Sequence, residues 1–138
     1  MSERTRWQAF LDGAFKIPAN DTLGFELTSD SSDEVTFTWT VPAELCNSAG
    51  NLQGGIMAAF ADSVLGAVCA TQLPDDVYPA LAEMKISFFR PAPAGTTITG
   101  TGRILKSGKR LLFVEAEITN AEGKLLAKVS GTEVAAKL

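Results

Sequence analysis

The sequence predicts an α+β fold in which one long helix packs against one large antiparallel sheet. From Gln53 to Gln72 the chain is almost wholly small or apolar, which is typical of a buried helix. On both sides of this segment apolar and polar residues alternate, as they do in half-buried strands. The later strands are separated by short turns, and short turns indicate antiparallel neighbours because parallel neighbours need longer crossovers.

The first element that we expect is a short amphipathic helix over residues 4–15, within a lead-in that covers residues 1–20. Its apolar residues recur at helical spacing and are Trp7, Phe10, Leu11, Ala14 and Phe15. Gly13 and Pro18 limit its length. We expect this helix to cover an edge of the sheet or the mouth of a channel.

The remaining elements follow from the alternating segments. Leu23, Phe25 and Leu27 mark one strand, and Val35, Phe37 and Trp39 mark the next, with a turn at residues 30–33. A helix over about residues 53–71 would be about 28 Å long, enough to cross the sheet. The strands expected after it cover approximately residues 82–88, 96–106, 112–118 and 124–136.

Composition excludes several classes of function. The 138 residues suit a single domain over 1–138. There is no histidine, which excludes histidine-based metal sites and Ser-His-Asp or Cys-His catalysis. The two cysteines have no metal-ligand or disulfide pattern, so we expect no metal and no cofactor. A net charge of −4 argues against nucleic acid as a partner.

The first twenty residues do not resemble a signal peptide, and Asp62 interrupts the long apolar segment. We therefore expect a cytoplasmic protein that does not enter the membrane.

Charge is unevenly distributed along the chain. Residues 1–84 carry 3 basic and 12 acidic side chains, whereas residues 85–138 carry 9 basic and 4 acidic ones. A solvated sheet face rich in lysine is one interpretation. The other is a binding site for the anionic end of a ligand, with the candidates Arg90, Lys106, Lys109 and Arg110.

Asp62 is the only charged residue in the long apolar segment. If the helix is buried, this carboxylate is costly unless a group pairs with it or a reaction uses it. The sequence therefore leaves two interpretations open, a paired structural carboxylate and a catalytic one.

The segment Asn47-x-x-Gly50-x-x-Gln53-Gly54-Gly55, with Asp62 nine residues after Gln53, resembles the hotdog-fold thioesterases. The most similar type is the phenylacetate-degradation branch with its 4-hydroxybenzoyl-CoA thioesterase relatives, and the resemblance extends from about residue 20 to the end. It implies a curved antiparallel sheet wrapped around one central helix. It also implies a homodimer or homotetramer whose sites lie between protomers, and hydrolysis of an acyl-CoA or related thioester.

The resemblance also implies roles for single residues. The Gly54 backbone N–H would bind the thioester carbonyl, Asp62 would act as general base or nucleophile, and Asn47 would orient the water or the carbonyl. Gln53 stands where most relatives have histidine. We expect the acyl group near Gly55, Met57, Phe60 and Phe88, and the CoA phosphates near Arg90, Lys106, Lys109 and Arg110.

Each of these features also has a purely structural interpretation. Gly54 and Gly55 could simply allow a tight entry into the helix, and Asn47 could be the first residue of an Asx turn. Because Gln53 cannot become cationic and residues 80–82 lack the serine that some relatives use, the alternative function is a non-catalytic protein that binds acyl-CoA or another acyl ligand. The sequence does not determine acyl length or the choice between CoA and carrier-protein thioesters.

Overall fold

A computed structural model describes residues 6–14, 16–31 and 33–138. In chain order the elements are α1 (Arg6–Leu11), α2 (Pro18–Leu23), β1 (Glu26–Asp30), β2 (Glu34–Thr40), a short 3-10 turn (Ala43–Leu45), α3 (Gly54–Ala70), β3 (Val77–Phe88), β4 (Thr97–Ser107), β5 (Leu111–Asn120) and β6 (Leu125–Lys137). The predicted long helix and the predicted alternation of strands are therefore confirmed.

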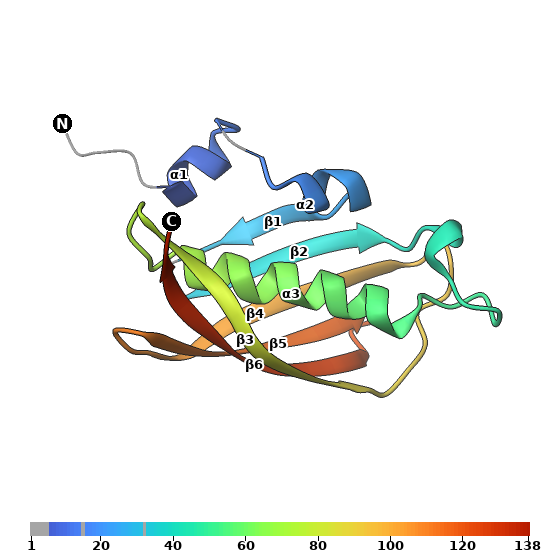
Figure 1. Ribbon diagram of the computed structural model, residues 1–138. Coiled ribbons are helices and arrows are strands. Elements are labelled where there is room, and N and C mark those ends of the chain that lie inside the picture. The colour runs from blue at the N-terminus through green and yellow to red at the C-terminus, as the bar shows by residue number, and fades with distance from the viewer. Residues whose placement is uncertain (1–5, 15, 32) are drawn as a thin grey trace.

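All strands belong to one six-stranded sheet in the order β1-β2-β4-β5-β6-β3, and every neighbouring pair is antiparallel. The sheet curves around α3, which lies along its concave side (Figure 1). Strand β3 does not pair with β4, the next strand in the chain, but takes the far edge beside β6. One side of β3 therefore has no neighbouring strand among the described residues.

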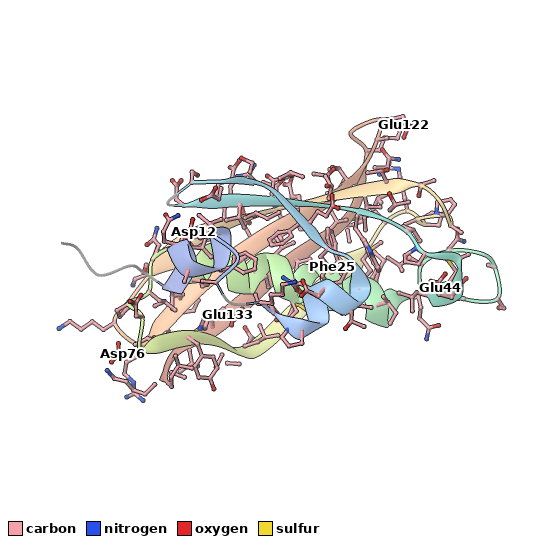
Figure 2. All side chains as sticks on the ribbon, turned by 90° about the horizontal axis from the view of Figure 1, so that it is seen from above. Asp12, Phe25, Glu44, Asp76, Glu122 and Glu133 are labelled. Atoms are coloured by element: carbon pink, nitrogen blue, oxygen red, sulfur yellow. The ribbon has the colours of Figure 1, made fainter. Side chains whose placement is uncertain are left out.

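The core fills the space between α3 and the concave face of the sheet. Glycines on the strands make room for the helix, since a Cβ added at Gly100 or Gly102 would lie within 3.0 Å of side-chain atoms of Val64. At one end Phe25 packs edge-on against Trp39, with ring centroids 4.7 Å apart, and against Phe60, with centroids 5.1 Å apart. Figure 2 labels Phe25 within this interior.

Two sequence expectations need correction near the N-terminus. Leu23 was expected to begin a strand but ends α2, because Pro18 starts a helix readily at its first position and Gly24 ends it with φ +88°. The helix expected over 4–15 is α1 over Arg6–Leu11, while residues 4 and 5 and Phe15 lie outside the described residues, as does Ser32 of the predicted turn.

A third difference concerns β3, which begins at Val77 rather than at about residue 82. Pro79 obscured its start in the sequence, since proline is confined to edge strands, the first residue of a strand and bulges. Here it is tolerated because β3 is an edge strand. Among residues 6–14, 16–31 and 33–138, no helix is long and apolar enough to cross a membrane.

Candidate functional site

The loop before α3 holds the first turn of the helix in a defined position. The Leu52 amide donates to the carbonyl of Ala92, and the Gln53 amide donates to the carbonyl of Leu45. Gln53 is the N-cap residue, and its side chain makes no capping hydrogen bond. Within the described part of the chain, neither the Gly54 amide nor the Gly55 amide donates a hydrogen bond. These free donors, at the positive end of the helix dipole, form a site suited to a developing negative charge.

A cleft of about 360 Å³ opens beside Gly54. Four other residues that the sequence singled out line it, namely Asn47, Met57, Phe88 and Arg90. The Phe88 ring lies against Gly54, so that a Cβ at that position would be 3.3 Å from its Cζ atom. Glycine therefore leaves the Gly54 N–H approachable next to an aromatic wall. Gly55 is exposed, and a Cβ there would meet no atom within 4 Å.

Asn47 forms the Asx turn that was one of its two interpretations. Its Oδ1 atom accepts hydrogen bonds from the backbone amides of Ala49 and Asn51, at 3.0 and 3.2 Å. The Nδ2 group donates to none of the described residues. The turn thus fixes the side chain by its oxygen and does not use its Nδ2 donors, so the structural role does not exclude a role toward a ligand.

Asp62 lies on α3 and is exposed in the single chain. The expectation of a carboxylate enclosed by a buried helix is therefore wrong for the chain alone. The protein around it still removes part of its water, and this desolvation raises the pKa of Asp62 above its ordinary value. Eight residues separate Asp62 from Gly54, a distance of about 12 Å along the helix axis.

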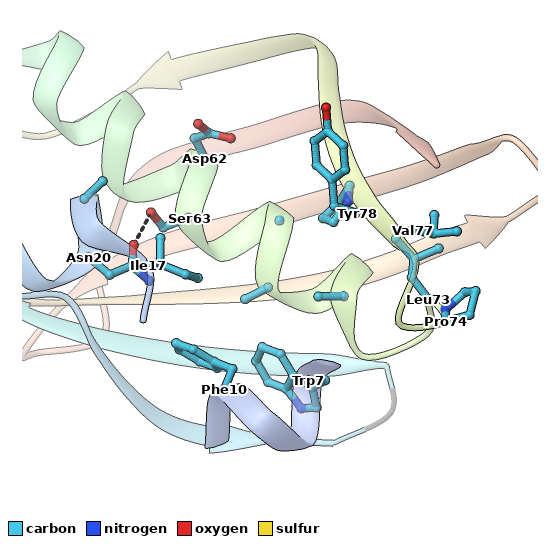
Figure 3. Close-up of a pocket in the computed structure, with 15 residues that line it drawn as sticks. Trp7, Phe10, Ile17, Asn20, Asp62, Ser63, Leu73, Pro74, Val77 and Tyr78 are labelled. Carbon is cyan, nitrogen blue, oxygen red and sulfur yellow. Dashed lines mark hydrogen bonds between the residues drawn. The ribbon is translucent and has the colours of Figure 1, made fainter. Parts of the chain in front are cut away.

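Asp62 lines a second cleft, of about 350 Å³. Trp7 and Phe10 of α1 form one wall of this cleft, and Leu73, Val77 and Tyr78 form another (Figure 3). The N-terminal helix, expected to cover an edge of the sheet or the mouth of a channel, lies beside both this cleft and the edge strand β1. Besides lining the cleft, Trp7 donates through Nε1 to Asp30 at the end of β1, at 3.2 Å.

Beside Asp62 in this cleft, Ser63 connects α3 to α2. Its hydroxyl donates to Oδ1 of Asn20 at 2.9 Å, and the Asn20 side chain is buried. This bond, drawn as a dashed line in Figure 3, ties the wall formed by the N-terminal segment to the helix that carries Asp62.

Phe60 does not have the position that was expected of a ligand-binding residue. It is fully buried, it packs against Phe25 and Trp39, and it lines neither the cleft at Gly54 nor the cleft at Asp62. Met57 is also buried, but it does border the cleft at Gly54.

The structure also separates the basic residues that were grouped as one phosphate site. Arg90 donates through Nη1 to the carbonyl of Leu125, at the start of β6. The carbonyl of Arg110 accepts from Ala135, near the end of that strand, about 33 Å farther along. Lys106 and Lys109 lie in or beside the same β4–β5 turn as Arg110, at the end of the molecule where α3 ends (Figure 1). One chain therefore cannot place all four side chains on one phosphate group.

Sequence reasoning missed Glu133. This residue of β6 is 1% exposed, and neither of its carboxyl oxygens has a hydrogen-bond partner within the described residues. A signal was present, because strand alternation places Glu133 on the same face as Val129 and Gly131. Among the described residues, no three His, Cys, Asp or Glu side chains form a group that could hold a metal ion.

Comparison with known proteins assigns the family. The family described as the thioesterase superfamily matches residues 49–127. Acyl-coenzyme A thioesterase 13 of Mus musculus is 31% identical over 118 residues, which cover 83% of this chain and 83% of the mouse protein. Acyl-coenzyme A thioesterase PaaI of Escherichia coli K12 is 28% identical over 109 residues, covering 79% and 76% of the two chains.

The fold is shared as well. A solved structure from Ralstonia eutropha JMP134, described as a putative thioesterase and phenylacetic acid degradation-related protein, superposes with a TM-score of 0.87 at 26% identity. The superposition covers 94% of this chain and 98% of that one. The family match spans more than half of the chain, and the helix and sheet agree with those expected from the resemblance, so the chain belongs to the thioesterase superfamily and has its hotdog fold.

Proposed function

We propose that the protein hydrolyses an acyl-CoA or related thioester at a site that two copies of the chain build together. The observation that carries this proposal is the placement of two complementary groups on one helix. The free amide of Gly54 opens into one cleft and the carboxylate of Asp62 into another. The first is suited to an oxyanion and the second to activating water.

The distance between these groups is the reason for a second copy. A general base must lie within hydrogen-bond reach of the water that it activates, whereas Asp62 is about 12 Å from Gly54 along the same helix. In a two-fold dimer with antiparallel α3 helices, each Gly54 would lie beside the Asp62 of its partner. The axis would pass near Ala58, midway between the two.

Two features of the chain support such a dimer. In the first half of α3, around the proposed axis, the residues that are not buried are small, namely Gly55, Ala58 and Ala59, and they allow close approach of a second helix. Beside it runs β3, a long edge strand with Leu81 and Phe88 exposed, and exposed edges of this kind are usually covered. A homotetramer made of two such dimers would meet the same requirement.

The proposed reaction uses groups of this chain alone. The thioester carbonyl accepts a hydrogen bond from the Gly54 N–H, assisted by the side-chain NH₂ group of Gln53. Asp62 of the partner takes a proton from a water that Asn47 orients, and the resulting hydroxide attacks the carbonyl carbon. The tetrahedral intermediate collapses as the carbon–sulfur bond breaks, and the thiolate takes the proton that Asp62 holds.

The clefts suggest how the substrate lies. Arg90, beside the Gly54 cleft, is placed to meet a phosphate of CoA, and Phe88 and Met57 border the thioester. The acyl group would extend into the apolar cleft of the partner behind Asp62, between α1 and β3. This replaces Phe60 as an acyl contact. The relatives named acyl-coenzyme A thioesterases in mouse and E. coli support the same substrate class.

The proposal is tested by thiol release from short, medium, long and aromatic acyl-CoA substrates. We expect Asp62→Asn to reduce kcat by a factor of about 10² to 10⁴, with the folded state unchanged because the side chain is exposed. Glu122→Gln, in the exposed β5–β6 turn, is the matched control and should retain full activity. Binding of acyl-CoA without turnover in the wild type would instead support the non-catalytic alternative, for which Gln53 is the main argument.

A mixing experiment tests the shared site directly. Gly54→Pro removes the N–H at a helix position that tolerates proline, and Asp62→Asn removes the base. When the two inactive variants are co-expressed, half of the dimers are mixed and each mixed dimer has one intact site, so about a quarter of wild-type activity should return. A site contained within one chain would restore none.

A further inference from the structure

Glu133 occupies an unusual position for an acidic residue. It lies on the concave face of the sheet, paired in register with Leu81 of β3 and Leu112 of β5. Figure 2 labels it inside the outline of the molecule, whereas Asp76 and Glu122 lie at its edge. Because its oxygens have no partner among the described residues, a charge on this side chain is unfavourable and a proton is held tightly.

The position under α3 follows from the neighbouring glycine. A Cβ at Gly131 would lie 2.9 Å from Cδ1 of Leu65, so Gly131 is directly beneath that residue. Glu133 is two residues farther along the same face, about 7 Å, and Cys69 is one helical turn farther along α3, about 6 Å. Glu133 therefore lies beneath the turn of α3 between Leu65 and Cys69, with Asp62 one turn before.

Two ionisable groups of α3, Asp62 and Cys69, interact electrostatically with Glu133. Burial, and then the charge on Asp62, raises the pKa of Glu133 to about 7. Burial, and then the charge on Glu133, raises the pKa of Cys69 to about 12, so that thiol stays neutral. The residues in register with it on β3 and β5 are leucines, and Glu83 of β3 instead accepts a hydrogen bond from Thr132 at 3.0 Å. Asp62 is thus the one charged group shown to act on Glu133.

We propose that Glu133 is a positioning residue that acts through Asp62: it holds a proton beneath α3, and when it releases that proton its charge makes Asp62 a stronger base. This inference rests on the proposed function, in which Asp62 takes a proton from water. Repulsion between two nearby carboxylates is reciprocal, so each negative charge favours protonation of the other. The proton lost by Glu133 passes to solvent before the reaction and is not part of the turnover.

The first test is the pH profile of kcat/KM for the wild type and Glu133→Gln, an isosteric variant that cannot ionise. We expect identical values at pH 6, where Glu133 holds its proton in the wild type. Above pH 7 the wild type should rise about threefold, as a stronger base gives a faster reaction, while Glu133→Gln shows no second rise. Glu83→Gln, on the neighbouring strand, should follow the wild type. Superimposable profiles for the wild type and Glu133→Gln would overturn the proposal.

The second test needs neither turnover nor a Glu133 variant. The side-chain carboxyl of Glu133, labelled with ¹³C, is titrated by NMR in the wild type and in Asp62→Asn. Removing the charge at Asp62 should shift the Glu133 titration to lower pH, and an unchanged midpoint would contradict the coupling. A wild type without thioesterase activity would contradict the proposed function, yet this titration would still decide whether the two carboxyls are coupled.

Discussion

The two faces of α3 are both apolar in sequence but are built in opposite ways. On the inner face, Phe60, Val64 and Val68 are fully buried, and the strand beneath them carries Gly102, where even a Cβ would lie 2.8 Å from Val64. On the outer face the residues are small, and a Cβ at Gly66 would meet no atom within 4 Å. The inner face has large side chains and no room, whereas the outer face has small side chains and open space.

This difference explains where the chemistry lies. Close packing on the inner face fixes the helix, as the density of protein interiors requires. The open outer face carries Asp62 and borders the cleft of about 350 Å³. Hydropathy could not distinguish the faces, because alanine and glycine count as apolar whether they are enclosed or exposed. Side-chain size, rather than polarity, separates the scaffold from the candidate site.

The largest change in stability that we expect comes from substituting Glu133, the acidic residue beneath the packed face of α3. Below pH 4.5 this carboxyl is protonated in both the folded and the unfolded chain, so it does not change the free energy of unfolding. Between pH 4.5 and about 7 the unfolded chain loses the proton while the folded chain keeps it, so stability falls as pH rises and then levels off. Glu133→Gln removes this loss and should stabilise the protein by up to about 3 kcal/mol at pH 8.

Urea unfolding at pH 4.5 and at pH 8, at one protein concentration, measures this prediction. The variant and the wild type should differ little at the lower pH and most at the higher. Glu122→Gln, in an exposed turn, should match the wild type at both. A Glu133→Gln variant that is less stable than the wild type at pH 8 would mean that the carboxylate has a favourable partner in the assembled protein.

The second prediction concerns Gly→Ala substitutions on the two sides of the helix, which should change stability in opposite directions. Gly102→Ala should destabilise the protein by about 1–3 kcal/mol, since the Cβ would lie 3.2 Å from the backbone oxygen of Val64 as well as against its side chain. Gly66→Ala should stabilise it by up to about 1 kcal/mol, because alanine is the better helix former. Thermal unfolding of both variants measures these changes, and equal shifts in Tm would refute the contrast between the faces.

Much of the fold follows from local pattern in the sequence, and the exceptions have physical causes. The long helix was predicted over 53–71 and spans Gly54–Ala70, because its apolar length leaves few alternatives. The pairing of β3 with β6 instead of β4 depends on packing around α3, which no local pattern encodes. Pro79 concealed the start of β3, since its tolerance there depends on the edge position of the strand.

The candidate site was predicted in part for the same reason. Asn47 and Gly54 of the loop motif lie in one cleft with Arg90. Asn47 and Gly54 are close in sequence, and Arg90 follows the end of β3, next to the loop. Arg90 and Lys106 lie far apart within one chain, since positive charge alone says nothing about which end of a strand a residue occupies. The exposure of Asp62 depends on which face of α3 the sheet covers.

The smallest change that we expect is in the acyl-length preference of kcat/KM. It tests whether the open space beside Asp62 holds the acyl group. Gly66 borders that cleft, and a Cβ at this position would meet no atom within 4 Å. A leucine there would extend into the cleft and also favour the helix. We expect Gly66→Leu to keep or raise thermal stability and to leave kcat/KM for the shortest acyl-CoA substrates unchanged. For the longest substrates kcat/KM should fall about tenfold or more, because a small change in an apolar pocket discriminates by that amount. Gly66→Ala, with a single added methyl, is the control and should shift the preference least. An equal loss for all acyl lengths would show that the cleft is closed by the dimer instead, and that the acyl group lies elsewhere.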